Sequence, residues 1–233
     1  MADKTRKIVY NSKSIGGILS KIATSFQFRL LSFYKDKKTV DLIKEIKKEV
    51  DFAFYPYEAF MIHSIVKTQV SFEGDMAEVG VYQGGSAKLI CEAKKEKTLY
   101  LFDTFTGLPK LSDDDTHFGE KYWYENQFSN TSVDSIKKLL DAYENVQIIK
   151  GEFPKSGEEI TDKKFCFVHL DVDLYKSTID SLRFFFPKMI SGGIILMHDY
   201  HSDGIQKAFR EFKNENDIQV IELTGSQAII IKN

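Results

Sequence analysis

Residues 74–86 read Gly-Asp-Met-Ala-Glu-Val-Gly-Val-Tyr-Gln-Gly-Gly-Ser, a short apolar run that passes into a glycine-rich turn. The apolar run favours a buried strand, and residues 86–93 beyond it have the composition of a helix. Gly80, Gly84 and Gly85 let the backbone approach a bound molecule closely, and the start of the helix offers free N–H groups. Tyr82 interrupts the G-x-G-x-x-G dinucleotide pattern, and the Gly-Lys-Ser/Thr of a phosphate loop is absent. The segment therefore predicts either a ligand-binding strand–turn–helix unit without a phosphate signature or a tight structural turn.

Apolar runs of strand length alternate with helical stripes through the rest of the chain. Strands are predicted over residues 76–81, 98–102, 146–149, 165–170, 194–197, 218–223 and 227–232, and helices over 86–93, 133–143, 179–187 and 205–212. Such alternation implies parallel βαβ units with helices on both faces of the sheet. The last two runs are too close for a crossover helix, so we expect them to pair antiparallel. The predicted fold class is α/β, with about seven mostly parallel strands, one of them reversed near the edge, and with Gly192–Gly193 as the turn into residues 194–197.

Composition places the chain among ordinary globular proteins. The 233 residues are 42% hydrophobic and 28% charged, and the net charge of -2 argues against nucleic-acid binding by the whole protein. Cys91 and Cys166 lie in apolar runs, which favours buried thiols and a reducing compartment. No apolar stretch approaches the ~18 residues of a membrane span, and no signal peptide opens the chain. We therefore expect a cytoplasmic location.

The first 48 residues differ from the rest in charge. They hold twelve Lys or Arg and four Asp or Glu, whereas the remaining residues hold 20 and 30. Residues 1–54 are therefore predicted to form a helical arm or lid, and residues 55–233 a separate domain. The arm would dock on the acidic body or on a second subunit of a homo-oligomer. The less favoured alternative is peripheral contact with an anionic membrane, through an apolar stripe with interleaved basic residues: Ile15, Ile18, Leu19, Ile22 and Phe26, with Lys13, Lys21 and Arg29.

Acidic residues follow the predicted strands, and the carboxyl ends of such strands are where open α/β sheets bind ligands. Asp103 ends the second strand ~20 residues after the glycines, where a carboxylate accepts hydrogen bonds from ribose hydroxyls. Glu78 would repel a pyrophosphate and suits a ligand with an ammonium or sulfonium charge. Gly80 and Asp103 together therefore predict a nucleoside site.

A second group of polar side chains follows the later strands. Asp171 and Asp173 flank one residue after the strand over 165–170, and His198-Asp199 follows the next strand. Close carboxylates repel one another unless a cation lies between them, and hard divalent cations prefer such oxygen clusters. The alternative for Asp173 is a structural role as the cap of the following helix.

Three further histidines and one long loop complete the candidate features. His169, inside an apolar strand, is predicted to be a core residue. His117 and His201 are expected on loops, where they could meet substrate, although simple surface positions are favoured. Residues 107–130 form a loop longer than is usual in a compact domain, which indicates a lid or binding loop. Its aromatic residues suit stacking on a sugar face or simple packing of the lid.

Four stretches together resemble a known family. They are residues 74–85, Phe102-Asp-Thr-Phe-Thr-Gly-Leu-Pro109, Leu170-Asp-Val-Asp-Leu-Tyr-Lys-Ser-Thr178, and Gly192–Gly193 leading to His198-Asp-Tyr200. Their order and spacing are similar, from about residue 55 to residue 215, to those of the macrocin O-methyltransferase (TylF/MycF-type) family of class I S-adenosylmethionine-dependent methyltransferases. The resemblance implies a Rossmann-like methyltransferase domain preceded by N-terminal helices.

The resemblance also implies roles for individual residues. Those expected at the cofactor S-adenosylmethionine are Glu78, Gly80, Tyr82, Gly84, Gly85 and Ser86 near its amino-acid end, Asp103 and Thr104 near the ribose, Gly151, Glu152 and Phe153 near the adenine, and Asp171. Asp173 is implied as the general base. Asp171, His198 and Asp199 are implied as ligands of a divalent metal, magnesium or manganese. The family has Asp-Asp-Tyr where this chain has His198-Asp199-Tyr200, and a nitrogen ligand suits magnesium less well than manganese, iron or zinc.

The function implied is O-methylation of a hydroxyl on a sugar or glycosylated small molecule. A cation lowers the pKa of a bound hydroxyl, which for an alcohol is near the ~16 of water, and a carboxylate can then accept the proton. Two alternatives stay open. The chain could be a cofactor-binding regulatory or assembly protein that has lost catalysis, which the change at His198 favours, or a nicotinamide-dependent oxidoreductase, against which Tyr82 and the reversed strand argue.

Overall fold

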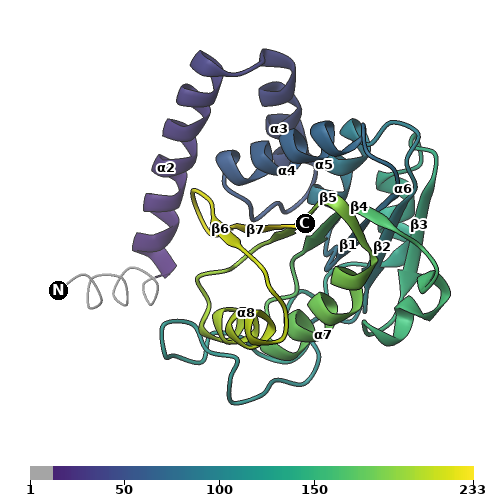
Figure 1. Cartoon of the computed structure of the whole chain (residues 1–233). Coiled ribbons are helices and arrows are strands. Elements are labelled where there is room, and N and C mark those ends of the chain that lie inside the picture. Colours follow the sequence, from purple (N-terminus) through teal and green to yellow (C-terminus); the bar gives the residue numbers. More distant parts are fainter. Residues whose placement is uncertain (1–12) are drawn as a thin grey trace.

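A seven-stranded sheet forms the centre of the molecule (Figure 1). The computed structural model describes residues 13–233, with side chains described from residue 17. The strands, in spatial order, are β3 (Val146–Lys150), β2 (Leu99–Asp103), β1 (Asp75–Val79), β4 (Phe165–Leu170), β5 (Met189–Met197), β7 (Ala228–Ile231) and β6 (Val220–Glu222). Only β7 runs against its neighbours, so the predicted fold class, with one reversed strand next to the edge, is confirmed. The order reverses between β1 and β4, and this switch point is where such sheets bind ligands.

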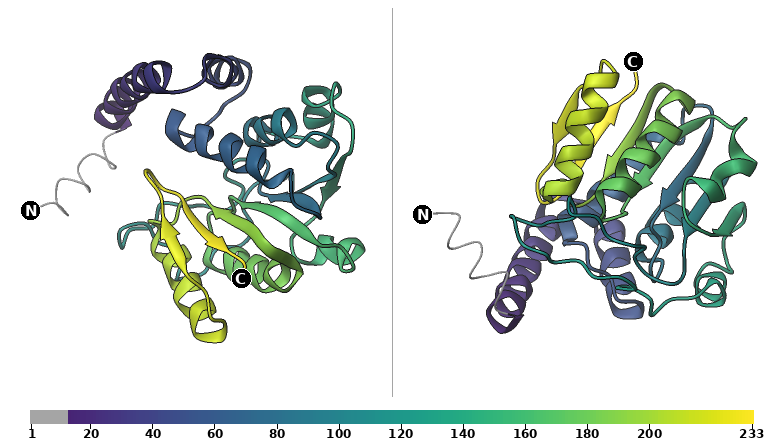
Figure 2. Two further views of the ribbon diagram at one scale, coloured as in Figure 1. Left: turned by 45° about the horizontal axis from the view of Figure 1, so that its top comes forward. Right: turned by 90° about the horizontal axis from the view of Figure 1, so that it is seen from below.

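Helices cover both faces of the sheet (Figure 2). They are α2 (Lys13–Tyr34), α3 (Lys37–Glu49), α4 (Pro56–Gln69), α5 (Gly85–Ala93), α6 (Val133–Leu139), α7 (Tyr175–Phe185) and α8 (Asp203–Glu215), with 3₁₀ turns η1 (Lys155–Ile160) and η2 (Phe186–Lys188). Side chains of α3 to α6 share one hydrophobic cluster with the sheet, and those of α7 and α8 share another. All six residues of β4 are consequently buried, as expected for a strand covered on both sides.

The start of β5 differs from the prediction. Gly192 and Gly193 lie inside this nine-residue strand and do not form a turn before it. The register between β4 and β5 shifts at this point, from Phe165 opposite Met189 to Phe167 opposite Ile194. Gly192 has a φ of +80°, so the glycine pair absorbs a bulge that lets the strand continue. Glycine pairs signal turns and bulges alike, which is why the sequence pattern alone suggested a turn.

The N-terminal helices divide into one that belongs to the core and one that projects from the body (Figure 1). Ile43 and Ile46 of α3 are fully buried in the cluster that also holds α4 and α5. In contrast, four residues of the predicted α2 stripe are exposed: Ile18, Leu19, Ile22 and Phe26. The Ile15 side chain and residues 1–12 of the predicted arm lie outside the described parts. The domain boundary at residue 54 stays a prediction, although α3 packs with the body. Within residues 13–233, no helix combines the length and apolarity needed to cross a membrane.

Replacing Ile43 by alanine tests whether α3 is part of the folding unit. Ile43 is fully buried, so we expect Ile43→Ala to lower the free energy of unfolding by about 2–5 kcal/mol. The matched control, Ile18→Ala on the exposed face of α2, should change it by less than about 0.5 kcal/mol. Urea unfolding of both variants measures the difference, and equal small effects would show that α3 is not part of this core.

Candidate functional site

A cavity of about 820 Å³ opens at the carboxyl ends of β1, β2, β4 and β5. This volume lies within the range of small-molecule sites. Three further segments complete its wall: residues 51–55 before α4, parts of the loop over 107–128, and Gly225 with Ser226 in the turn between β6 and β7. Segments far apart in the sequence therefore meet around one site, which lies at the switch point of the sheet.

Most residues predicted at the cofactor line this cavity. They are Gly80, Tyr82, Gly85, Ser86, Asp103, Thr104, Gly151, Glu152, Phe153 and Asp171. Gly80 has a φ of +86°, and a Cβ at this position would lie 1.8 Å from the backbone oxygen of Asp171. Only glycine therefore allows the ends of β1 and β4 to approach so closely at the cavity wall.

Asp103 organises the glycine-rich turn. One of its carboxylate oxygens, Oδ2, accepts hydrogen bonds from the backbone N–H groups of Val81 (2.8 Å) and Tyr82 (2.9 Å). The other, Oδ1, accepts one from Phe105 N (2.7 Å). Asp103, which is predicted to bind the ribose, thus lines the cavity. It also holds the backbone of the glycine-rich turn and of the segment after β2, a structural role that sequence spacing alone did not indicate.

Glu78 and Gly84 are not among the residues that line the cavity. Glu78 is fully buried, and its Oε1 lies 2.7 Å from Nδ1 of His169, itself fully buried. Burial raises the pKa of Glu78 well above its usual value and lowers that of His169 to about 4, so burial disfavours the charged form of both side chains. His169 is the core residue that the sequence suggests, whereas contact of Glu78 with a cofactor stays a prediction.

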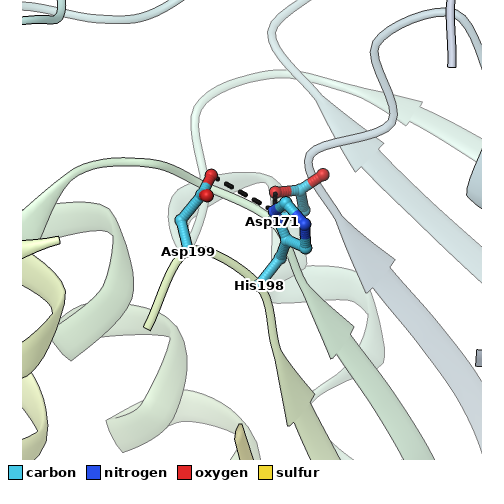
Figure 3. Close-up of side chains that lie close together, drawn as sticks. All are labelled: Asp171, His198 and Asp199. Carbon is cyan, nitrogen blue, oxygen red and sulfur yellow. Dashed lines mark ion pairs between the residues drawn. The ribbon is translucent and has the colours of Figure 1, made fainter. Parts of the chain in front are cut away.

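Asp171, His198 and Asp199 meet just beyond the carboxyl ends of β4 and β5 (Figure 3). Nδ1 of His198 lies 3.2 Å from Asp171 Oδ1 and 3.2 Å from Asp199 Oδ2. Burial opposes a charge on His198, but the two carboxylates outweigh it and raise its pKa well above the usual value. Burial likewise opposes ionisation of Asp199, yet His198 lowers its pKa to about 2. The two carboxylates therefore favour a positive charge at the position of His198 Nδ1, which lies close to both of them.

The geometry of these three residues fits a divalent metal ion. Their donor atoms all lie within 4.8 Å of one another. Among the described residues, the buried Nδ1 of His198 has no properly aligned hydrogen-bond partner, although two carboxylate oxygens are near it. One nitrogen and two oxygens that converge in this way are a donor set for a transition metal.

Asp173 lies beside this group in a strained conformation. Its φ is +60°, and that of Asp199 is +53°, in a region that residues other than glycine seldom adopt. Burial and the charges of Asp199 and Asp171 raise the pKa of Asp173 well above its usual value. The helix-cap alternative is wrong, because the N-cap of α7 is Leu174 and Tyr175 N donates instead to Asp115.

The loop over 107–130 and the segment after β5 both contribute side chains to the cavity. His117 and His201, expected on the surface, both line the cavity, and their ring centroids are 4.7 Å apart. The surface expectation was wrong for His117, which is buried and lies 3.1 Å from the hydroxyl of Ser202. Aromatic side chains of the loop line the same wall: Phe118, Tyr122, Trp123 and Phe128.

Two contributors to the site had no motif in the sequence. The segment over 51–55 is held by Lys47, whose ammonium donates to the backbone oxygens of Phe52 and Phe54, both at 2.7 Å. The Phe54 ring packs against His198, with centroids 4.4 Å apart. Glu58 of α4 lies 3.6 Å from Nε2 of the same histidine. The only feature of the sequence that could have pointed to Glu58 is an acidic residue on the face of a helix that is otherwise expected to be buried.

Comparisons with known proteins agree on one family and one fold. The family model of macrocin O-methyltransferases (TylF) matches residues 59–225. Mycinamicin III 3''-O-methyltransferase of Micromonospora griseorubida is 25% identical over 166 residues, which cover 64% of this chain and 65% of that protein. A Streptomyces olivaceus enzyme, 8-demethyl-8-(2,3-dimethoxy-alpha-L-rhamnosyl)-tetracenomycin-C 4'-O-methyltransferase, is 23% identical over 167 residues, 66% of this chain and 64% of that one. The matched region thus spans just under two thirds of the length of these relatives.

A solved structure extends the comparison of folds to almost the whole chain. The calicheamicin methyltransferase CalS11 is 18% identical to this chain and superposes with a TM-score of 0.69. The superposition covers 94% of this chain and 93% of CalS11. At this identity the likeness shows that the two proteins share a fold.

Proposed function

Because the chain belongs to the macrocin O-methyltransferase (TylF) family, we propose that it transfers a methyl group from S-adenosylmethionine to a hydroxyl of a sugar or glycosylated small molecule. One observation carries the proposal. The turn at Gly80 and Asp103 and the carboxylates of Asp171, Asp173 and Asp199 line a single cavity. A methyl donor and its acceptor need this adjacency, because displacement at a sulfonium requires oxygen, carbon and sulfur in line.

The donor half of the proposal concerns the glycine-rich turn. Gly80 lets the ends of β1 and β4 meet at the wall where the donor is proposed to bind, and Asp103 is proposed to accept hydrogen bonds from the ribose while it holds Val81 and Tyr82. Phe153 packs edge-on against Phe102, with ring centroids 5.0 Å apart, and both line the cavity, which offers an apolar surface for the adenine. The carboxylates of Asp171, Asp173 and Asp199, which line the same cavity, would favour the positive sulfonium.

The acceptor half concerns the carboxylates. We propose that Asp173 takes the proton of the acceptor hydroxyl, because a carboxylate within reach of that hydrogen serves as a general base. Asp171, His198 and Asp199 would hold a divalent metal ion, which when bound lowers the pKa of a coordinated hydroxyl. Burial raises the pKa of Asp173, and a cation beside it would favour the ionised form, which is the form that can accept a proton.

The proposed acceptor class rests on the cavity wall and on the relatives. Tyr122 and Trp123 pack edge to face, with centroids 4.8 Å apart, and both line the cavity. Aromatic faces stack on the apolar faces of sugars. The name of the Streptomyces olivaceus relative describes a rhamnosyl compound as its acceptor.

The experiment that tests the proposal is a methyl-transfer assay with radiolabelled S-adenosylmethionine and a panel of nucleotide sugars and glycosides. We expect label in at least one glycoside, stimulation by an added divalent metal, and loss of transfer on chelation to below about one hundredth. Transfer that is unaffected by a chelator would contradict metal assistance. Binding of the donor without transfer to any acceptor would favour the non-catalytic alternative, which the replacement at His198 suggests.

A further inference from the structure

The side of His198 that faces away from Asp171 and Asp199 is held by a buried glutamate. Glu58 of α4 is 2% exposed. Its Oε1 accepts hydrogen bonds from the backbone N–H and the hydroxyl of Ser226, both at 2.8 Å, and its Oε2 accepts one from Tyr55 N at 2.8 Å. Backbone N–H groups can only donate hydrogen bonds, and one of them lies against each oxygen of Glu58, so both oxygens are acceptors.

Hydrogen-bond counting then assigns the proton on Nε2 of His198. The Ser226 hydroxyl has one proton, which it donates to Glu58. Its oxygen lies 3.0 Å from Nε2 of His198, and in this contact it can only accept. Nε2 therefore carries a hydrogen, and Glu58 Oε2, 3.6 Å from the same nitrogen, favours it further. The nitrogen that remains for a metal ion is Nδ1, which faces Asp171 and Asp199.

The hairpin turn between β6 and β7 is shaped to make this contact. Gly225 has a φ of +97°, and a Cβ there would lie 2.5 Å from Oε1 of Glu58. A side chain at this position would push the turn away from Glu58 and take Ser226 with it. The end of the sheet and the N-terminal helices thus jointly orient one imidazole.

We propose that Glu58, through Ser226, is a positioning residue that fixes His198 as an Nδ1 ligand, so that the site has one nitrogen and two carboxylate ligands and prefers Fe²⁺, Co²⁺ or Zn²⁺ to Mg²⁺. A carboxylate that accepts from the outer nitrogen of a metal-binding histidine fixes the tautomer and raises the basicity of the ligand. Imidazole ligands suit these borderline cations, whereas magnesium prefers an all-oxygen set. The inference rests on the proposed function only in taking this cluster as the metal site.

Cobalt tests the proposal without methyl donor or acceptor. When His198 binds paramagnetic Co²⁺ through Nδ1, its Nε2 hydrogen gives a strongly shifted proton resonance that disappears in D₂O. We expect one such resonance in the wild-type protein and none in His198→Asp. We also expect Glu58→Gln to weaken Co²⁺ binding about 10–100-fold, measured by titration calorimetry. The control is Glu73→Gln, the same change at an exposed position, which should bind Co²⁺ like the wild type.

A second titration tests the choice of metal. His198→Asp should shift the ratio of the Mg²⁺ and Co²⁺ dissociation constants at least about tenfold towards Mg²⁺. If Glu58→Gln does not fold, as judged by thermal melting, Ser226→Ala breaks the same chain of hydrogen bonds at a half-buried residue. Three results would each overturn the proposal. They are a Co²⁺ affinity of Glu58→Gln and Ser226→Ala equal to that of the wild type, a wild-type Co²⁺ complex without the exchangeable resonance, and a wild-type protein that does not bind Co²⁺. Binding of the methyl donor is measured in a separate experiment. The Co²⁺ results can therefore be interpreted even if the protein proves not to transfer methyl groups.

Discussion

Replacing Asp173 by asparagine is expected to lower kcat by about 10²–10⁴-fold while donor binding stays within about twofold of the wild type. The amide has nearly the same shape but cannot accept the hydroxyl proton at useful rates. Asp173 lies at the cavity wall and has no role in capping α7, so the change should leave the helix intact. Steady-state kinetics with saturating metal and calorimetry with S-adenosylmethionine measure the two effects.

The control for this variant is Asp141→Asn, an identical change at an exposed residue that does not line the cavity. It should leave kcat unchanged. An Asp173→Asn protein with full activity would remove the base role from this residue. Equal losses of donor binding and turnover would instead assign Asp173 to cofactor binding.

Replacing Asp103 by alanine is expected to weaken S-adenosylmethionine binding at least about 100-fold. The variant loses a proposed contact with the ribose and three backbone hydrogen bonds, from Val81, Tyr82 and Phe105. Hydrogen bonds to a charged acceptor contribute about 1.5–3 kcal/mol each, and 1.4 kcal/mol is a factor of ten in affinity. Calorimetric titration with the donor measures the loss.

The exposed Asp217→Ala is the matched control and should bind the donor like the wild type. A thermal melt of Asp103→Ala should show a modest loss of stability, because the freed N–H groups lie next to a cavity that admits water. Donor affinity equal to that of the wild type would exclude Asp103 from the cofactor site.

The fold and most of the cavity wall could be predicted from the sequence because they depend on local patterns. Apolar runs that alternate with helical stripes fixed the sheet, and strand ends in a parallel sheet lie at one edge, which brought Asp103, Asp171 and His198 together. The predicted turn at Gly192–Gly193 was wrong for a local reason, because a glycine pair can form a bulge within a strand as well as a turn before it.

Contacts between distant segments could not be predicted in this way. Glu58 lies on a helix more than 130 residues before His198, and no spacing rule connects them. Glu78 shows a related limit, because the end of its strand lies at the site while its side chain contacts His169 and does not line the cavity. Successive side chains of a strand point to opposite faces of the sheet, and the sequence does not show which face carries the site at the end of the strand.

The central claim is that neighbouring strand ends hold the methyl donor beside a carboxylate that accepts the hydroxyl proton. The most direct measurement is a crystal structure of the protein with S-adenosylhomocysteine and Co²⁺. The account predicts the nucleoside against Gly80 and Asp103, the sulfur facing Asp173, and the metal ion bound by Asp171, His198 and Asp199. A donor product bound anywhere else, with the cavity at Gly80 and Asp103 filled only by water, would contradict it.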